Sequence, residues 1–92
     1  MDFTNKVALI TGAGGGIGRA TTLGFARGGA KVLVVDANAD NGQATADLVS
    51  QSGGAARFVQ ADVTKSSSVQ AYVKACLDSY GRIDCFFNNA GI

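Results

Sequence analysis

The sequence predicts an α/β fold, a doubly wound parallel sheet with helices on both of its faces. Short runs of consecutive apolar residues alternate with helix-like segments from Lys6 to Asn88, which is a βαβαβαβ order. The runs are continuous rather than alternating in polarity, as expected for parallel strands that are covered on both sides. Each run stops at a glycine or a polar residue. At 92 residues, the chain has room for a single domain spanning 1–92. The strand order expected for the first four strands of a doubly wound sheet is 3-2-1-4.

The apolar runs place strands at 7–10, 32–35, 58–61 and 83–87. In an open parallel sheet, ligands bind in the crevice beyond the carboxyl ends of the strands. Four polar strand ends should therefore line one edge of the sheet. They are Thr11, Asp36, Asp62 and Asn88.

The intervening segments predict three helices. The first runs from Ile17 to a stop at Gly28-Gly29, the second covers about 40–52, and the third covers about 66–80 with Thr64 or Ser66 as its cap and Gly81 at its end. Periodicity assigns each helix a face toward the sheet. The expected faces are Ile17, Ala20, Thr21 and Gly24; Ala44, Leu48 and Val49; and Val69, Val73, Cys76, Leu77 and Tyr80.

Composition excludes several kinds of function. The formal charge is +1, with no run of like charge, so no electrostatic footprint for nucleic acid or an acidic membrane is present. The sequence contains no His and no Glu, which removes histidine bases, histidine metal ligands, Ser-His-Asp triads and paired-glutamate sites. We therefore expect a small-molecule partner and no metal.

The two cysteines and the absence of targeting signals bear on location. The chain shows neither a signal peptide nor a run of 18 apolar residues, so neither secretion nor membrane spanning is indicated, and we expect a cytoplasmic protein. Cys76 and Cys85 are expected to be small core residues. A redox pair and a metal site are the alternatives.

A glycine-rich segment, Thr11 to Gly18, follows the first strand and opens the first helix. The start of a helix offers free N–H groups and the positive end of its dipole, and glycines let a pyrophosphate approach them. A merely flexible turn is the alternative. The spacing meets neither G-x-G-x-x-G, since position 17 is Ile when counted from Gly12, nor the Walker motif, since no Gly-Lys-Ser/Thr occurs. What remains is Thr-Gly-x-x-x-Gly-x-Gly.

This motif resembles that of the short-chain dehydrogenase/reductase family. Asn88-Asn89-Ala90-Gly91 is similar to the family's NNAG motif, Asp62-Val63 to a third element, and the likeness covers essentially the whole chain in order and spacing. The resemblance implies a Rossmann-type sheet and hydride transfer between a nicotinamide dinucleotide and an alcohol or carbonyl substrate. For the complete protein we expect a homo-oligomer, a dimer or tetramer.

Asp36 points to NAD rather than NADP. It ends the second strand, close to where an acidic residue takes up the adenosine ribose hydroxyls, and its charge repels a 2′-phosphate. Relatives that use NADP usually carry a cation just before the second motif glycine or just after the acidic position, where this chain has Gly15 and Ala37. The alternative is that Asp36 only caps the following helix or turn.

The resemblance also assigns the other roles. Asp62 and Val63 hold the adenine edge, unless Asp62 only caps a turn. Asn88 holds neighbouring strands together, and Ala90 and Gly91 lie against the ribose next to nicotinamide. Asn88 and Asn89 could instead be purely structural amides. The expected cofactor-binding residues are Gly12, Gly14, Gly15, Gly16, Ile17, Gly18, Asp36, Ala37, Asp62, Val63, Asn89, Ala90 and Gly91, with Thr11 and Asn88 in structural roles.

No residue of the chain is expected to be catalytic. The family's catalytic tyrosine is followed four positions later by lysine, whereas Tyr72 is followed by Cys76 and Tyr80 by Asp84. Tyr80 is expected in the core. Two explanations stay open: the 92 residues are the amino-terminal part of a longer dehydrogenase, or they are a half-domain that only binds dinucleotide.

Overall fold

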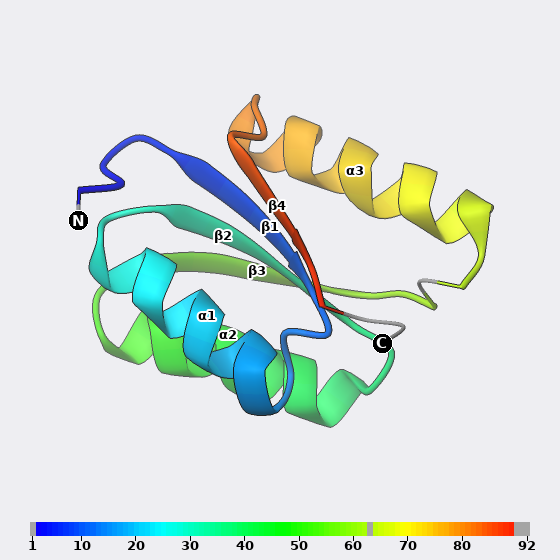
Figure 1. Ribbon diagram of the computed structural model, residues 1–92, viewed down its shortest axis with the longest axis horizontal. Helices are drawn as coiled ribbons and strands as arrows, with labels where there is room; N and C mark the ends of the chain where they lie inside the picture. Colours follow the sequence, from blue (N-terminus) through cyan, green and yellow to red (C-terminus); the bar gives the residue numbers. More distant parts are fainter. Residues whose placement is uncertain (1, 63, 90–92) are drawn as a thin grey trace.

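The computed structural model describes residues 2–62 and 64–89. The elements in chain order are β1 (Val7–Thr11), α1 (Gly16–Arg27), β2 (Lys31–Asp36), α2 (Ala39–Gln51), β3 (Ala55–Gln60), α3 (Ser66–Tyr80) and β4 (Cys85–Asn88). The strands form one parallel sheet in the order β3-β2-β1-β4, with α1 and α2 on one face and α3 on the other (Figure 1). The predicted fold class and strand order are confirmed.

Each face of the sheet carries its own core. Residues alternate along β1, so that Val7 and Leu9 pack with Tyr72 and Cys76 of α3. Ala8 and Ile10 face the other way, toward α1 and α2. Because both faces are covered, every residue of β1 is buried, which explains why its first four residues are all apolar.

The first helix turns a different face to the sheet than periodicity predicted. Ile17 is 70% exposed, Ala20 and Gly24 are also exposed, and the buried positions are Gly18 and Thr22. Close contact at Gly18 explains this rotation: a Cβ there would lie 1.9 Å from the carbonyl oxygen of Gly12. Steric fit to the preceding loop, rather than apolar side chains, therefore sets the face of α1.

The second helix is also rotated from its predicted face. Val49 is buried as expected, but Ala44 and Leu48 are exposed. A Cβ at Gly42 would lie 2.0 Å from the ring of Phe58 in β3, so the glycine side of α2 lies over that ring. The buried residues of the helix are Gly42, Thr45, Ala46 and Val49.

The third helix follows its predicted bounds and face more closely. Cys76 is buried, and Val69, Val73 and Tyr80 pack against the core, but Leu77 is 46% exposed and Tyr72, which the pattern missed, is 2% exposed. Neither predicted cap is used. The N-cap is Lys65, whose side chain has no acceptor for a capping bond. The Thr64 hydroxyl donates to Asp62 instead of capping the helix. Gly81 ends the helix in the left-handed conformation, as predicted.

All four strands differ from their predicted bounds by at least one residue, and the largest differences are at the starts of β3 and β4. β3 begins at Ala55, because residues 55–57 pair with Lys31 to Leu33 of β2 although they do not form an apolar run. Ile83 precedes β4 rather than belonging to it. Backbone pairing, which the side-chain pattern does not record, determines both boundaries.

Candidate functional site

The glycine loop lies at the carboxyl end of β1, where it leads into α1 (Figure 1). Its first part extends the sheet pairing, since the amide of Ala13 donates to the carbonyl of Val35 at 3.1 Å. Gly12 and Gly16 have φ of 62° and 48°, a region that glycine enters at no steric cost. These two positions form the tight turn that the sequence predicted.

The remaining glycines of the loop differ in what requires them. A Cβ at Gly14 would lie 2.7 Å from the Asp36 carboxylate and 2.8 Å from Cβ of Asn41, so the protein itself excludes a side chain there. A Cβ at Gly15 would meet nothing within 4 Å, and its φ of −150° suits any residue. Nothing in the described chain requires glycine at position 15, and the space in front of it is open.

The start of α1 carries no neutralising side chain, a property that it shares with the start of α3. Its N-cap, Gly15, makes no side-chain capping bond, and its first turn contains no acidic residue. The start of α2 differs, because Asn38 accepts a bond from the amide of Asn41 at 2.9 Å and Asp40 lies in the first turn. The first-turn N–H groups of α1 and its dipole therefore face the open space without a neutralising side chain.

The Asp36 carboxylate lies against this loop. One oxygen accepts from the amide of Gly14 and the other from the amide of Asn38, both at 2.8 Å. Asp36 thus stabilises the turn into α2, but the helix cap itself is Asn38. Ala37 is exposed beside it. The acidic residue at the end of β2 and the glycine loop after β1 meet at the same edge.

The end of β4 is joined to the loop through Thr11. The Thr11 hydroxyl donates to the side-chain oxygen of Asn88 at 2.9 Å and accepts from the amide of Asn89 at 3.1 Å. The side-chain amide of Asn89 donates to the carbonyl of Gly12 at 3.4 Å. Both asparagines therefore have structural partners where β1 and β4 end.

Asp62 lies just beyond the end of β3, next to the Asp36 segment, since the amide of Ala61 donates to the carbonyl of Asp36 at 3.2 Å. Its carboxylate accepts from the hydroxyl of Thr64 at 2.6 Å and from the amide of Thr64 at 3.0 Å. The Thr64 hydroxyl bond, followed by the amide bond, lowers the pKa of Asp62. Asp62 therefore caps a turn in this structure. Val63, Ala90 and Gly91 lie outside the described residues.

Two residues that the sequence reasoning missed bind the back of the loop. The Arg19 guanidinium donates through Nη2 to the carbonyl of Gly14 and through Nε to the hydroxyl of Thr45, both at 2.8 Å. The hydroxyl of Thr45, which is fully buried, lies 2.9 Å from the carbonyl of Ala13. One feature of the sequence could have revealed Arg19: it is a cation near the start of a helix, where the helix dipole disfavours positive charge.

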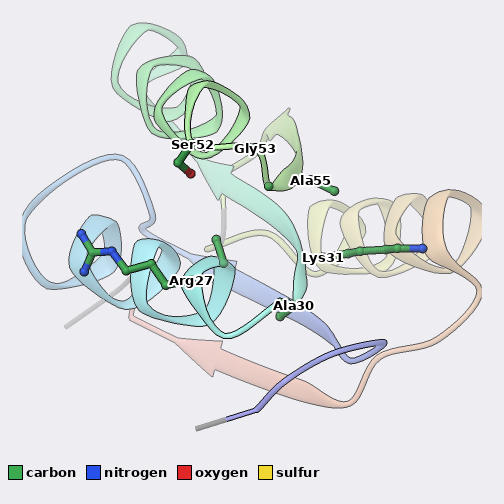
Figure 2. A pocket seen from close by; sticks show the side chains of 9 residues that line it. Arg27, Ala30, Lys31, Ser52, Gly53 and Ala55 are labelled. Atoms are coloured by element: carbon green, nitrogen blue, oxygen red, sulfur yellow. The ribbon is translucent and has the colours of Figure 1, made fainter.

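A hollow of about 460 Å³ lies at the opposite edge of the sheet, between the ends of α1 and α2 and the starts of β2 and β3. Figure 2 shows that its two cationic side chains, Arg27 and Lys31, extend in opposite directions rather than toward one another. The hollow does not involve the residues that the sequence singled out.

The cysteines occupy the core rather than a site. Cys76 is buried, and burial raises the pKa of its thiol, which keeps it protonated at neutral pH. Cys85 packs against the core on the opposite face of the sheet, and both thiols are free. Within the described residues, no cluster of His, Cys or Asp could hold a metal ion, and no helix has the length and apolarity needed to cross a bilayer.

Comparison with known proteins identifies the family. The model of a family described as short chain dehydrogenase matches residues 6–92. The chain belongs to this family. Among its relatives, a short chain dehydrogenase/reductase of Aspergillus oryzae, astE, is 49% identical over all of this chain. A hydroxysteroid dehydrogenase structure from Escherichia coli superposes on 99% of the chain with a TM-score of 0.96 and 37% identity.

The chain covers different shares of the length of its relatives. It spans 36% of the Aspergillus protein and 39% of the Escherichia coli structure, in both cases less than two fifths of the relative. A homolog from Bacillus subtilis, YusS, is 39% identical, and the chain covers 85% of it. The chain corresponds to the amino-terminal portion of a short-chain dehydrogenase.

Proposed function

We propose that the chain is the NAD-binding part of an oxidoreductase that moves hydride between NAD(H) and an alcohol or carbonyl substrate. The observation that carries this proposal is the meeting of the glycine loop with Asp36, whose carboxylate lies 2.8 Å from the amide nitrogen of Gly14. The loop offers N–H donors to a pyrophosphate, and the carboxylate offers acceptors to a ribose. Family membership supplies the reaction class.

The residues that would hold the dinucleotide fit its chemistry. The open space before Gly15 and the uncapped start of α1 suit the pyrophosphate. Each oxygen of Asp36 accepts one amide bond and retains a lone pair for a ribose hydroxyl. When bound, the nicotinamide ring supplies the hydride-transfer chemistry. Asp62, Val63, Asn89, Ala90 and Gly91 complete the proposed site.

The preference for NAD over NADP rests on charge. Within the described part of the chain, the bonds to Asp36 come from backbone amides and none from a cation. A 2′-phosphate at that position would meet a carboxylate without a compensating partner. Arg19 is the nearby cation, but its guanidinium is bound to Gly14, Asn41 and Thr45 behind the loop.

The proposal extends to the whole protein that contains this chain. No residue here is assigned to proton transfer, and we propose that the catalytic groups belong to another segment of that protein. We propose a homo-oligomer in the cytoplasm, a location that suits the two free thiols.

The direct test is equilibrium binding of NAD and NADP to the intact protein, together with turnover of a panel of small alcohols and carbonyl compounds. We expect binding of NAD in preference to NADP, and NAD-dependent turnover. Tighter binding of NADP would contradict the cofactor assignment. Lack of binding by either dinucleotide would contradict the proposed function.

A second function is a module that binds dinucleotide without catalysis, so that occupancy controls assembly or a partner. The observation that favours it is the length of YusS, of which the chain covers 85%. Binding of NAD with no turnover by the intact protein would support the module, whereas a Tyr-x-x-x-Lys segment elsewhere in that protein would argue against it.

A further inference from the structure

We infer that Arg19 and Thr45 are positioning residues that orient the Gly14-Gly15 peptide for the dinucleotide, an inference that rests on the proposed function. Arg19 and Thr45 come from different helices, α1 and α2, yet both bind carbonyl groups of the glycine loop. We call these two side chains and their bonds the loop clasp. The motifs that predicted the site do not include either residue.

The geometry of the peptide bond explains why the clasp matters for a ligand. A trans peptide points its carbonyl and its N–H in opposite directions. The Gly14 carbonyl is bound by the guanidinium of Arg19 at 2.8 Å, on the side of α2. The N–H of Gly15 in the same peptide therefore points away from the guanidinium. A Cβ on Gly15 would meet nothing within 4 Å, so the space beside this residue is open.

The preceding peptide is fixed at both ends. Its carbonyl, on Ala13, lies 2.9 Å from the buried hydroxyl of Thr45, closer than the carbonyl of Asn41, which lies 3.2 Å from the same hydroxyl. Its N–H, on Gly14, donates to Asp36 at 2.8 Å. The clasp thus also sets where the ribose-binding carboxylate meets the loop. Without side chains of their own, consecutive glycines would otherwise leave both peptides free to rotate.

Arginine suits this role better than lysine. Its planar fork reaches three acceptors on two elements, namely the carbonyls of Gly14 and Asn41 and the hydroxyl of Thr45. A lysine keeps the charge but presents a single point donor group on a flexible stem. This difference separates a positioning role from simple attraction of an anion by positive charge.

The test measures the Kd for NAD of the intact protein and of Arg19→Met, Arg19→Lys, Thr45→Val and Thr45→Ser. The expected result is a rise in Kd of roughly tenfold or more for Arg19→Met, for Arg19→Lys and for Thr45→Val, because hydrogen bonds to charged or buried groups have effects of this size. Thr45→Ser, which keeps the hydroxyl, should restore the affinity. The matched control is Arg27→Met, at the far end of α1, with an unchanged Kd.

Each other outcome overturns a stated part of the inference. Affinity within twofold of the unsubstituted protein in both Arg19→Met and Thr45→Val would show that the clasp does not position the loop. Recovery of affinity in Arg19→Lys would replace positioning by charge attraction. If the Arg19 variants do not fold, Thr45→Val against Thr45→Ser decides the matter. Failure of the unsubstituted protein to bind NAD would overturn the proposed function together with the clasp.

Discussion

At the scale of single residues, Gly18 shows how one missing side chain sets the geometry of the loop. A Cβ at this position would lie 1.9 Å from the carbonyl oxygen and 2.7 Å from the carbonyl carbon of Gly12, both backbone atoms that cannot move aside cheaply. We expect Gly18→Ala to lower the free energy of unfolding by roughly 1–3 kcal/mol, the usual range for overpacking. Denaturant unfolding of the purified protein measures it.

Gly24 provides the matched control, because it lies in the same helix and a Cβ there would meet nothing within 4 Å. Gly24→Ala should raise stability by roughly 0.5–1 kcal/mol, since alanine restricts the unfolded chain and favours the helix. Equal effects of the two substitutions would contradict the close contact between Gly18 and Gly12.

The proposed preference for NAD over NADP depends on the charge of one residue, Asp36. Asp36→Asn keeps the size of the side chain and an acceptor oxygen but removes the charge that repels a 2′-phosphate. Two like charges about 4 Å apart near a protein surface repel by about 4 kcal/mol, so we expect the ratio of the Kd for NADP to that for NAD to fall by roughly tenfold or more. Titration with both dinucleotides measures this ratio.

The control for this substitution is Asp47→Asn, on the exposed face of α2, which should leave the ratio unchanged. An unchanged ratio in Asp36→Asn would refute the role of Asp36 in the cofactor preference.

At the scale of elements, Thr11 joins β1 to β4 through one hydroxyl that both donates and accepts. Thr11→Val keeps the shape of the side chain but leaves the Asn88 oxygen and the Asn89 amide without that partner. We expect a loss of about 1–2 kcal/mol in unfolding free energy. Thr11→Ser should lose less, and a Thr11→Val variant as stable as the unsubstituted protein would contradict the role.

The starts of the same two strands are held by Asp84. Its carboxylate accepts from the amide of Val7 at 2.8 Å and from the Arg82 guanidinium at 2.6 Å, and these bonds, that of Arg82 first, lower its pKa. A lowered pKa in the folded state stabilises the protein above the unfolded-state value of about 3.9, and the effect is lost as pH falls through the folded value. Asp84→Ala should therefore reduce the Tm at pH 7, with a difference that shrinks below about pH 4.

A matched acidic residue checks that result. Asp78 pairs with Lys74 on the exposed surface of α3, with both side chains more than half exposed. Asp78→Asn should leave the Tm almost unchanged at any pH, because exposed ion pairs contribute little. A difference for Asp84→Ala that persists unchanged into acid would mean that its charge is not what holds the strands.

The comparison of sequence with structure is also clearest at the scale of elements. The strands and the loop were predictable, because buried parallel strands and a glycine-rich turn have strong local patterns. The faces of α1 and α2 were not, because tight contacts at Gly18 and Gly42 decide them and glycine contributes nothing to an apolar stripe. The loop clasp could not be predicted from the sequence for a related reason. It joins Arg19 and Thr45, which are distant in sequence and outside every motif.

At the scale of the whole molecule, the β4 edge of the sheet determines how the 92-residue chain behaves by itself. β4 is an outer strand in the sheet order, and Phe86 and Phe87 on it are 46% and 37% exposed. Exposed apolar strand edges promote association. The chain expressed alone should form concentration-dependent oligomers in sedimentation experiments, and Phe87→Lys should reduce them. A strictly monomeric chain at high concentration would contradict this expectation.

The central claim, that a dinucleotide binds at the carboxyl edge of the sheet, is tested most directly by hydrogen exchange of the intact protein with and without NAD. We predict that NAD slows exchange in residues 12–18 and 36–38, which form the glycine loop and the Asp36 turn, and leaves residues 52–55 at the opposite edge unchanged. Protection confined to 52–55, or no protection by NAD anywhere, would contradict the account.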